Sequence, residues 1–363
     1  MINLYTPSIT ENDKKLVNKA LRETNLSGGT EVVNEFEDAF SKKYNFKYCL
    51  STNSGTAALH LALLSSGIGK GDEVIIPSLS FIATANAVSY VGAKPVIVDV
   101  DRRTFQISLD EIKKNISKRT KAIIPVHLYG NSPDLNAINK ISNEFNLKII
   151  QDSAEALGTS YMNKPSGSFG DVGIYSFYPN KLITTGEGGM LVTSNKNIYL
   201  KAKNLRGQGL KENTNEYIHS SIGYNYRMNS LSAALGISQL KNVDVFLKRK
   251  IEIFQLYKEK LESENLEFIE TTNGVENSHW LTVVSFRSQK ININSLRKFL
   301  YTQNIETKKI FYPIDRQTIY KSKNPVKVSH AIYQKSICLP SSPNLTNKQI
   351  SFVSNKIIKF LKD

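Results

Sequence analysis

Two short segments decide the fold of this chain: QDSAEALG at residues 151–158 and SFYPNKLITTGEGGM at residues 176–190. A short apolar run at residues 147–150 precedes the first segment and predicts a buried strand. Asp152 then follows at the carboxyl end of that strand, the edge of an open α/β sheet where ligands collect. The second segment places Lys181 in a polar, glycine-rich turn between two apolar runs. A loop on a rigid frame is therefore expected to present this lysine.

A carboxylate at a strand end and a lysine on a nearby loop form the pair that pyridoxal phosphate (PLP) requires. The lysine forms a Schiff base with the aldehyde, and the acid keeps the ring nitrogen protonated so that the ring accepts electrons. The pair alone decides little, because a strand-end Asp commonly caps a helix and a loop Lys is commonly a solvated surface charge. The complete strings around Asp152 and Lys181 are more informative.

These strings resemble the sugar-nucleotide aminotransferases of the DegT/DnrJ/EryC1/StrS family, within the aspartate-aminotransferase superfamily. The resemblance covers nearly the whole chain and is strongest over residues 51–240. It implies an α/β protein of the aspartate-aminotransferase type (fold type I), with a mostly parallel central sheet. A large PLP-binding domain is expected at residues 1–245 and a smaller C-terminal α+β domain at residues 246–363. The resemblance also implies a homodimer with shared active sites.

Residues 48–63, YCLSTNSGTAALHLAL, predict a strand, a turn of small residues and a helix. The first amides of such a helix and its positive dipole end can hold a phosphate. Gly55 allows close backbone approach, and Ser54 and Thr56 can add hydroxyl donors. A plain helix N-cap is the simpler interpretation of these residues, but the similar Gly-Thr-Ala-Ala-Leu turn of the family favours a phosphate site.

Further roles follow from the resemblance. Phe81 would stack on the cofactor ring, although core packing explains it equally well. Asn225 would reach the cofactor phosphate of the neighbouring subunit. His127 lies between apolar residues and is expected to be structural rather than a general base. The predicted site comprises Lys181 as the catalytic residue, Ser54, Gly55, Thr56, Phe81, Asp152, Glu155, Ser176, Lys181 and Asn225 as cofactor contacts, Tyr312 and Asp315 as substrate contacts, and no metal.

Glu155 and the TTGEGG run at residues 184–189 resemble one branch of the family, the GDP-perosamine synthases, which aminate C4 of a mannose derivative. Members that dehydrate instead carry His in place of Lys181. Where the perosamine branch has a Thr-Arg pair and a His, this chain has Thr307-Lys308 and Asp315. Lys does not present the donor geometry of Arg. The departure leaves the chemistry intact and the substrate open.

We therefore expect PLP-dependent transfer of an amino group from L-glutamate to C4 of a nucleotide-linked 4-keto-6-deoxyhexose, for surface polysaccharide biosynthesis. GDP-4-keto-6-deoxymannose is the favoured substrate, and a UDP- or dTDP-linked sugar is the near alternative. A non-catalytic sensor or binding protein on the same fold is the alternative from a different class. Asp152 and Lys181 count against it, because a protein without PLP chemistry has little need for both.

Composition narrows the class of protein further. The chain has 363 residues, 40% of them hydrophobic, and a net charge of +15. The basic residues alternate with apolar ones and form no nucleic-acid-binding motif, so an anionic small substrate explains the charge better than nucleic acid does. No apolar run approaches the ~18 residues of a membrane helix, and no signal peptide is evident. Two distant cysteines, Cys49 and Cys338, favour the reducing cytoplasm.

Apolar spacing predicts the other elements of the chain. A capping sequence at Thr10 should open a helix. Strands are expected at residues 48–50, 73–77, 95–99, 122–130 and 280–286. Helices are expected at residues 33–44, 83–90, 230–261, 295–303 and 347–361.

Overall fold

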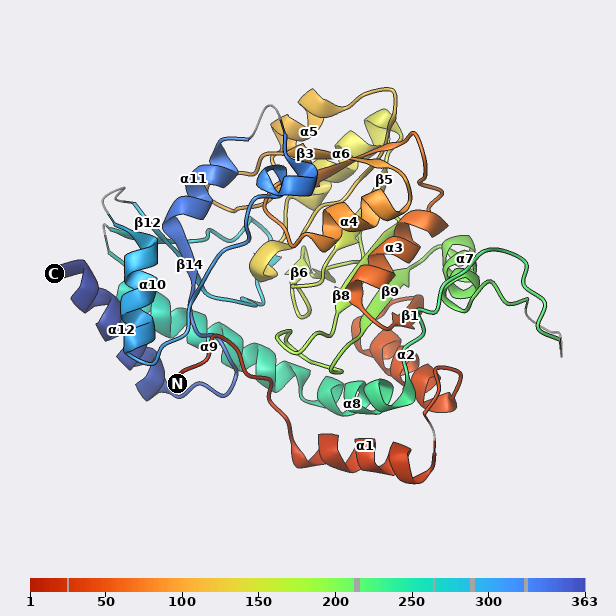
Figure 1. The fold of residues 1–363 in the computed structure, drawn as a ribbon, viewed down its shortest axis with the longest axis horizontal. Coiled ribbons are helices and arrows are strands. Elements are labelled where there is room, and N and C mark those ends of the chain that lie inside the picture. The colour runs from red at the N-terminus through yellow and green to blue at the C-terminus, as the bar shows by residue number, and fades with distance from the viewer. Residues whose placement is uncertain (25, 212–215, 264, 288–290, 323–325, 363) are drawn as a thin grey trace.

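The computed structural model describes residues 1–24, 26–211, 216–263, 265–287, 291–322 and 326–362. A seven-stranded sheet forms its centre (Figure 1). In spatial order the strands are β1 (Tyr48–Thr52), β9 (Gly189–Thr193), β8 (Val172–Ser176), β5 (Lys148–Asp152), β4 (Thr120–Ile123), β2 (Glu73–Pro77) and β3 (Lys94–Val98). Strand β9 is antiparallel to both of its neighbours, and the other adjacent pairs are parallel. The predicted, mostly parallel sheet is confirmed.

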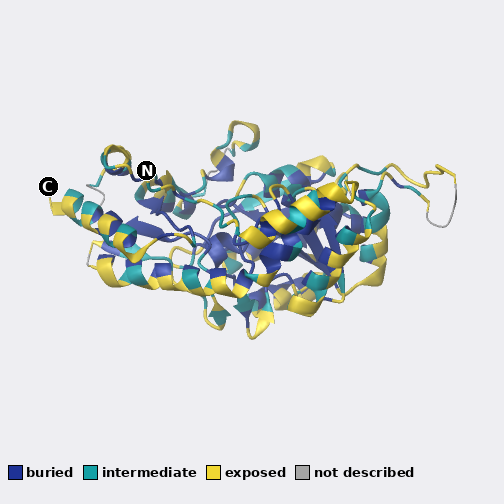
Figure 2. Ribbon diagram, turned by 90° about the horizontal axis from the view of Figure 1, so that it is seen from below, coloured by how far each residue is buried: buried dark blue, intermediate teal, exposed yellow. Residues whose placement is uncertain are grey.

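Helices cover both faces of this sheet, as β-branched strands with two buried faces require. Val74 and Ile76 face one apolar core, whereas Ile75 between them faces another. The helices on the first face are α3 (Gly55–Ser65), α4 (Ala83–Tyr90) and α7 (Lys196–Arg206). Those on the second face are α2 (Glu31–Tyr44), α5 (Leu109–Asn115), α6 (Leu135–Phe145) and α8 (Ser230–Lys241). Figure 2 shows the buried strands between helices whose outer faces are exposed.

Helix α3 begins two residues after β1 and confirms the predicted strand, turn and helix. The Ser54 hydroxyl accepts a hydrogen bond from the Ala57 amide at 3.1 Å and so caps the helix. Nearly all residues of α3 are buried, which suits a helix that is apolar on every side. Its N-terminus therefore lies at the carboxyl edge of the sheet. Helix α1 (Glu11–Arg22) has the capping box predicted at Thr10.

A second, smaller region contains a four-stranded antiparallel sheet. Its strands, in spatial order, are β10 (Leu266–Phe268), β12 (Val283–Phe286), β14 (Ser336–Cys338) and β13 (Lys308–Lys309). The accompanying helices are α9 (Val243–Leu261), α10 (Ile293–Thr302), α11 (Val328–Lys335) and α12 (Asn347–Lys362). Along α9, Val243 and Phe246 belong to a core of the large sheet, and Ile253 belongs to the small-region core. The predicted smaller α+β region is thus present, while the boundary at residue 245 stays a prediction.

Three predicted elements differ from the structure. The helix expected over residues 230–261 is divided at Asn242, which takes a non-helical conformation between α8 and α9. Asn competes with the backbone for hydrogen bonds, and its side chain here donates to the Ser238 carbonyl. Strand β4 ends at Ile123, because the chain then turns into a 3-10 helix in which Tyr129 has a φ of 56°. Strand β12 begins at Val283 rather than at residue 280.

Smaller elements complete the fold. Strands β11 (Val275–Glu276), β6 (Ser160–Tyr161) and β7 (Lys164–Pro165) form a three-stranded sheet. Between α7 and α8 a long excursion of the chain projects away from the body of the protein (Figures 1 and 2). Within the described residues, every helix is too short or too polar to cross a membrane.

Candidate active site

A cavity of about 470 Å³ opens at the carboxyl edge of the large sheet and extends to the small sheet. Its walls combine residues from β5, the α3 N-terminus, the loop between β8 and β9, and β13. Most of the residues predicted for the site line this one cavity, namely Ser54, Gly55, Thr56, Phe81, Asp152, Glu155, Ser176 and Lys181. Residues that are more than a hundred positions apart in the sequence are therefore brought together.

Lys181 lies in the loop between β8 and β9, where its backbone is held at both ends. Its amide donates to the Tyr178 carbonyl at 2.9 Å, and its carbonyl accepts from the Tyr5 hydroxyl at 2.6 Å. Its Nζ lies 3.7 Å from Oε1 of Glu155. Burial lowers the pKa of Lys181, and the nearby carboxylates oppose that shift. Its amine therefore loses its proton more readily than that of an exposed lysine, which suits a nucleophile and a base.

Asp152 ends β5 and is buried, as the preceding apolar run predicted. Its Oδ2 accepts a hydrogen bond from the Thr84 hydroxyl at 2.8 Å, and its Oδ1 accepts one from the Ala154 amide at 3.2 Å. Burial raises the pKa of this carboxyl, although both hydrogen bonds and the charge of Lys181 lower it. A cation placed beside Asp152 would stabilise the ionised form.

Glu155 connects the lysine to the opposite wall of the cavity. Its Oε2 accepts from the Tyr129 amide at 2.9 Å, while its Oε1 faces Lys181. Burial raises the pKa of Glu155 to about 7, with the positive charge of Lys181 acting against it. This carboxyl can therefore gain or lose a proton near neutral pH.

The turn before α3 packs tightly against both β8 and β9. A Cβ atom on Gly55 would lie 2.9 Å from Cβ of Ser176, and one on Gly189 would lie 2.5 Å from the Ser54 carbonyl oxygen. Glycine is therefore required for this close approach. The turn places the Thr56 and Ser176 hydroxyls beside the first amides of α3, which are donors without carbonyl partners in an α-helix. Such a donor set fits a phosphate.

Three predicted residues lie outside this cavity. Asn225 is exposed at the base of the projecting excursion, where its carbonyl accepts from the Asn53 side chain at 3.2 Å. Tyr312 is half-exposed and packs edge-on against Tyr333. Asp315 is fully buried, and the predicted contact between it and the substrate does not match the structure.

The reason for the Asp315 mismatch is that its carboxylate is already engaged. Oδ1 accepts from the Ser78 hydroxyl at 2.6 Å, and Oδ2 lies 2.8 Å from Nε2 of His330 and 3.2 Å from the Val326 amide. This network ties the segment after residue 313 to the end of β2. Asp315 thus acts on the wall of the cavity and not on its contents.

Two residues of the site were not recognised from the sequence. Thr84, at the start of α4, is the hydroxyl donor to Asp152. Trp280 forms part of the cavity wall, and Nζ of Lys181 lies 3.9 Å from the centre of its ring. The one signal available was composition, because Trp280 is the only tryptophan in the chain. His127, by contrast, is buried away from the cavity, and burial lowers its pKa to about 4.

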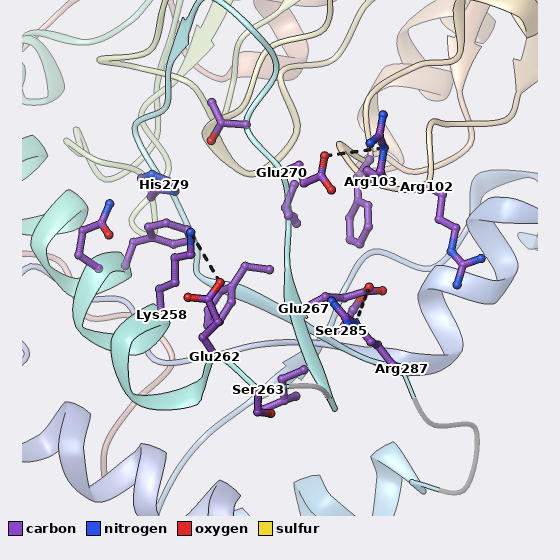
Figure 3. Close-up of a pocket in the computed structure, with 17 residues that line it drawn as sticks. Arg102, Arg103, Lys258, Glu262, Ser263, Glu267, Glu270, His279, Ser285 and Arg287 are labelled. Atoms are coloured by element: carbon purple, nitrogen blue, oxygen red, sulfur yellow. Dashed lines mark ion pairs between the residues drawn. The ribbon is translucent and has the colours of Figure 1, made fainter.

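A second cavity, of about 570 Å³, lies between the segment after β3 and the α9 to β12 region (Figure 3). Its walls carry charges of both signs, which pair with one another. Arg103 and Glu270 are 3.7 Å apart, and Lys258 and Glu262 are 3.9 Å apart. The residues predicted for the active site lie elsewhere, in the cavity around Lys181.

Comparison with known proteins agrees with this geometry. Residues 7–358 match the DegT/DnrJ/EryC1/StrS aminotransferase family. This chain belongs to that family. It is 39% identical to the GDP-perosamine synthase of Escherichia coli O157:H7, over 100% of this chain and 99% of that protein. It is 35% identical to the GDP-perosamine synthase of Vibrio cholerae, with 98% of each chain covered.

Among solved structures, the PLP form of Spr1654 from Streptococcus pneumoniae superimposes with a TM-score of 0.92 at 27% identity. The match covers 99% of this chain and 98% of that one. The chain is therefore a PLP-dependent sugar aminotransferase of fold type I. The predicted family, fold class and cofactor are confirmed.

The residues around the cavity fit this cofactor. Lys181 supplies the amine for the aldehyde, and buried Asp152 supplies a negative charge for the ring nitrogen. The turn at residues 54–56 has the amides and hydroxyls for the phosphate. Phe81, which is 58% exposed although it lines the cavity, offers an apolar face to a planar ring.

Proposed function

We propose that this aminotransferase moves the amino group of L-glutamate to C4 of a GDP-linked 4-keto-6-deoxyhexose, with GDP-4-keto-6-deoxymannose as the favoured substrate. The product, GDP-perosamine, would serve surface polysaccharide synthesis. The observation that carries the proposal is the single cavity that unites Lys181, Asp152 and Glu155. The choice of sugar is supported by full-length similarity to two relatives named GDP-perosamine synthase.

In this reaction the donor nitrogen replaces the keto oxygen at C4, 2-oxoglutarate leaves, and a proton is added to C4. When bound, PLP supplies an electron-poor ring that accepts the electron pair released at the reacting carbon. Nζ of Lys181 is the group that removes and returns the proton, because burial keeps its pKa low. Asp152 holds a negative charge at the floor of the cavity, and Glu155 orients the lysine amine.

The proposal includes a homodimer in which Asn225 contacts the cofactor phosphate bound by the partner. Its support is the exposure of Asn225 beside the turn at residue 53 and the projection of the neighbouring excursion from the body (Figure 1). We also place the reaction in the cytoplasm. Cys49 and Cys338 are both free and buried, as is common in a reducing compartment.

A UDP- or dTDP-linked 4-keto sugar is the second candidate substrate. It is favoured by Lys308, which lines the cavity at a position where the perosamine branch carries Arg. An ammonium group binds phosphate as a point charge, whereas a guanidinium group makes two parallel hydrogen bonds. A change at this position could therefore alter the preference among nucleotide sugars.

The test is a panel of GDP-, UDP- and dTDP-linked 4-keto-6-deoxy sugars with L-glutamate, in which the aminated product is identified by mass spectrometry. The GDP-linked sugar should react with the highest kcat/KM, and Lys181→Ala should abolish turnover. Borohydride reduction of the PLP-loaded protein should leave the cofactor attached to Lys181 in peptide maps. Equal turnover of all three nucleotide sugars would refute the GDP preference, and cofactor attachment elsewhere would refute the site.

A further inference from the structure

The amine of Lys181 lies over the face of the only tryptophan in the chain. Its Nζ is 3.9 Å from the centre of the Trp280 ring, well inside the range of a cation–π interaction. Trp280 is 5% exposed and lines the cavity together with Lys181. An indole presents the most favourable aromatic face for a cation, and the attraction strengthens where water is excluded.

The indole is fixed in this position by contacts at its edge and on both sides. Its Nε1 donates to the carbonyl of Asn180, the residue before Lys181, at 2.6 Å. Its ring is nearly parallel to those of Tyr129 and Phe311, with interplanar angles of 10° and 16°. Because Trp280 is bound to the same loop that carries Lys181, the ring and the amine keep their relative position.

A second partner for the amine lies on another side. Oε1 of Glu155 is 3.7 Å from Nζ of Lys181, and the other oxygen of this carboxylate is held by the Tyr129 amide. The protonated lysine is thus placed between a carboxylate and an aromatic face. Both partners favour the ammonium form, whereas burial disfavours it.

We propose that the indole face of Trp280 is the resting place of the Lys181 ammonium whenever the lysine is not joined to the cofactor. Trp280 is then a positioning residue, which holds the protonated amine within reach of the reacting carbon and returns it to the same place in each cycle. The inference rests on the proposed function, because it concerns the proton that Lys181 carries to and from the substrate.

The magnitude follows from the strength of the interaction. A cation over a buried indole gains about 1 to 2 kcal/mol, which corresponds to about 5- to 30-fold in the protonation equilibrium. Without the ring, the Lys181 ammonium should therefore release its proton at a pH lower by about 0.7 to 1.5. A residue that only fills space would leave this midpoint unchanged.

The test compares Trp280→Leu and Trp280→Phe with the wild type, in the full-length protein without cofactor. Trace acetylation across a pH series reports the uncharged fraction of Lys181, with the modified peptide quantified by mass spectrometry. Trp280→Leu should lower the midpoint by the amount given above. Trp280→Phe removes the hydrogen bond to Asn180 but keeps a weaker aromatic face, so it should lower the midpoint by less. An unchanged or raised midpoint in Trp280→Leu would overturn the proposal.

Circular dichroism establishes that each variant is folded. If Trp280→Leu does not fold, the Trp280→Phe midpoint decides, and its equality with the wild type overturns the proposal. In the loaded enzyme, Trp280→Leu should reduce kcat about 5- to 30-fold with little change in KM for the sugar nucleotide. Acetylation needs no substrate, so a wild type inactive on GDP-linked sugars would refute the substrate proposal and leave this inference standing. An unshifted Lys181 midpoint would do the reverse.

Discussion

Replacing Thr84 by Val removes the hydroxyl that holds Asp152 while preserving the shape of the side chain. Thr84 is buried in α4, and its Oγ1 donates to Oδ2 of Asp152 at 2.8 Å. The Ser80 hydroxyl lies 2.7 Å from the same Oγ1. Since the single Thr84 proton is directed to Asp152, Ser80 is left as the donor to Thr84. The substitution therefore removes one donor to a buried carboxylate and one acceptor for Ser80.

The expected magnitude follows from the charge on the acceptor. A hydrogen bond to an ionised group contributes about 1.5 to 3 kcal/mol. Burial already raises the pKa of Asp152, and Thr84 lowers it, so the variant should ionise this carboxyl at a higher pH. Ionised Asp152 is the form that stabilises a protonated cofactor ring. PLP should therefore bind about 10- to 150-fold more weakly to Thr84→Val, with the greatest loss at low pH.

The assay is a titration of the cofactor-free protein with PLP at several pH values, followed by visible absorbance. Thr84→Ser is the matched control, because it keeps the hydroxyl and should retain most of the affinity. Urea denaturation of both variants separates a general loss of stability from a loss at the site. If Thr84→Val bound PLP as tightly as the wild type at pH 6, the assignment of Thr84 as the donor that supports Asp152 would be refuted.

Two further substitutions test how the site is built. Gly189→Ala should abolish tight PLP binding and destabilise the fold by about 1 to 3 kcal/mol, because its Cβ would meet backbone at Ser54; retention of bound PLP after dialysis would contradict this. Burial lowers the pKa of Lys250 to about 7, so between this pH and its ordinary value the unfolded chain binds more protons than the folded one, and the free energy of unfolding should rise with pH by at most about 1.4 kcal/mol per pH unit. In Lys250→Met, urea unfolding between pH 7 and 9 should lack that rise, and an identical pH slope in both proteins would show that Lys250 is not buried as described.

Much of the fold could be predicted from local pattern. The apolar runs that became β2 and β5 have two buried faces, so they read as continuous β-branched stretches. Strand order was not available from these runs, because it depends on which strands pair across the sheet. The break at Asn242 was also missed, since the apolar spacing continues through it and the change of direction depends on the two cores on which α8 and α9 pack.

The sequence by itself determined the chemistry, because Asp152, Lys181 and the turn at residues 54–56 lie in strings that admit few other structures. Only the tertiary structure decided what surrounds them. Thr84 reaches Asp152 across 68 positions, and Trp280 meets the Lys181 loop across about a hundred. No local pattern encodes such contacts, because burial and pairing of distant side chains arise only when the sheet and the small region pack together. The same packing took Asp315 out of the cavity by giving its carboxylate partners within the protein.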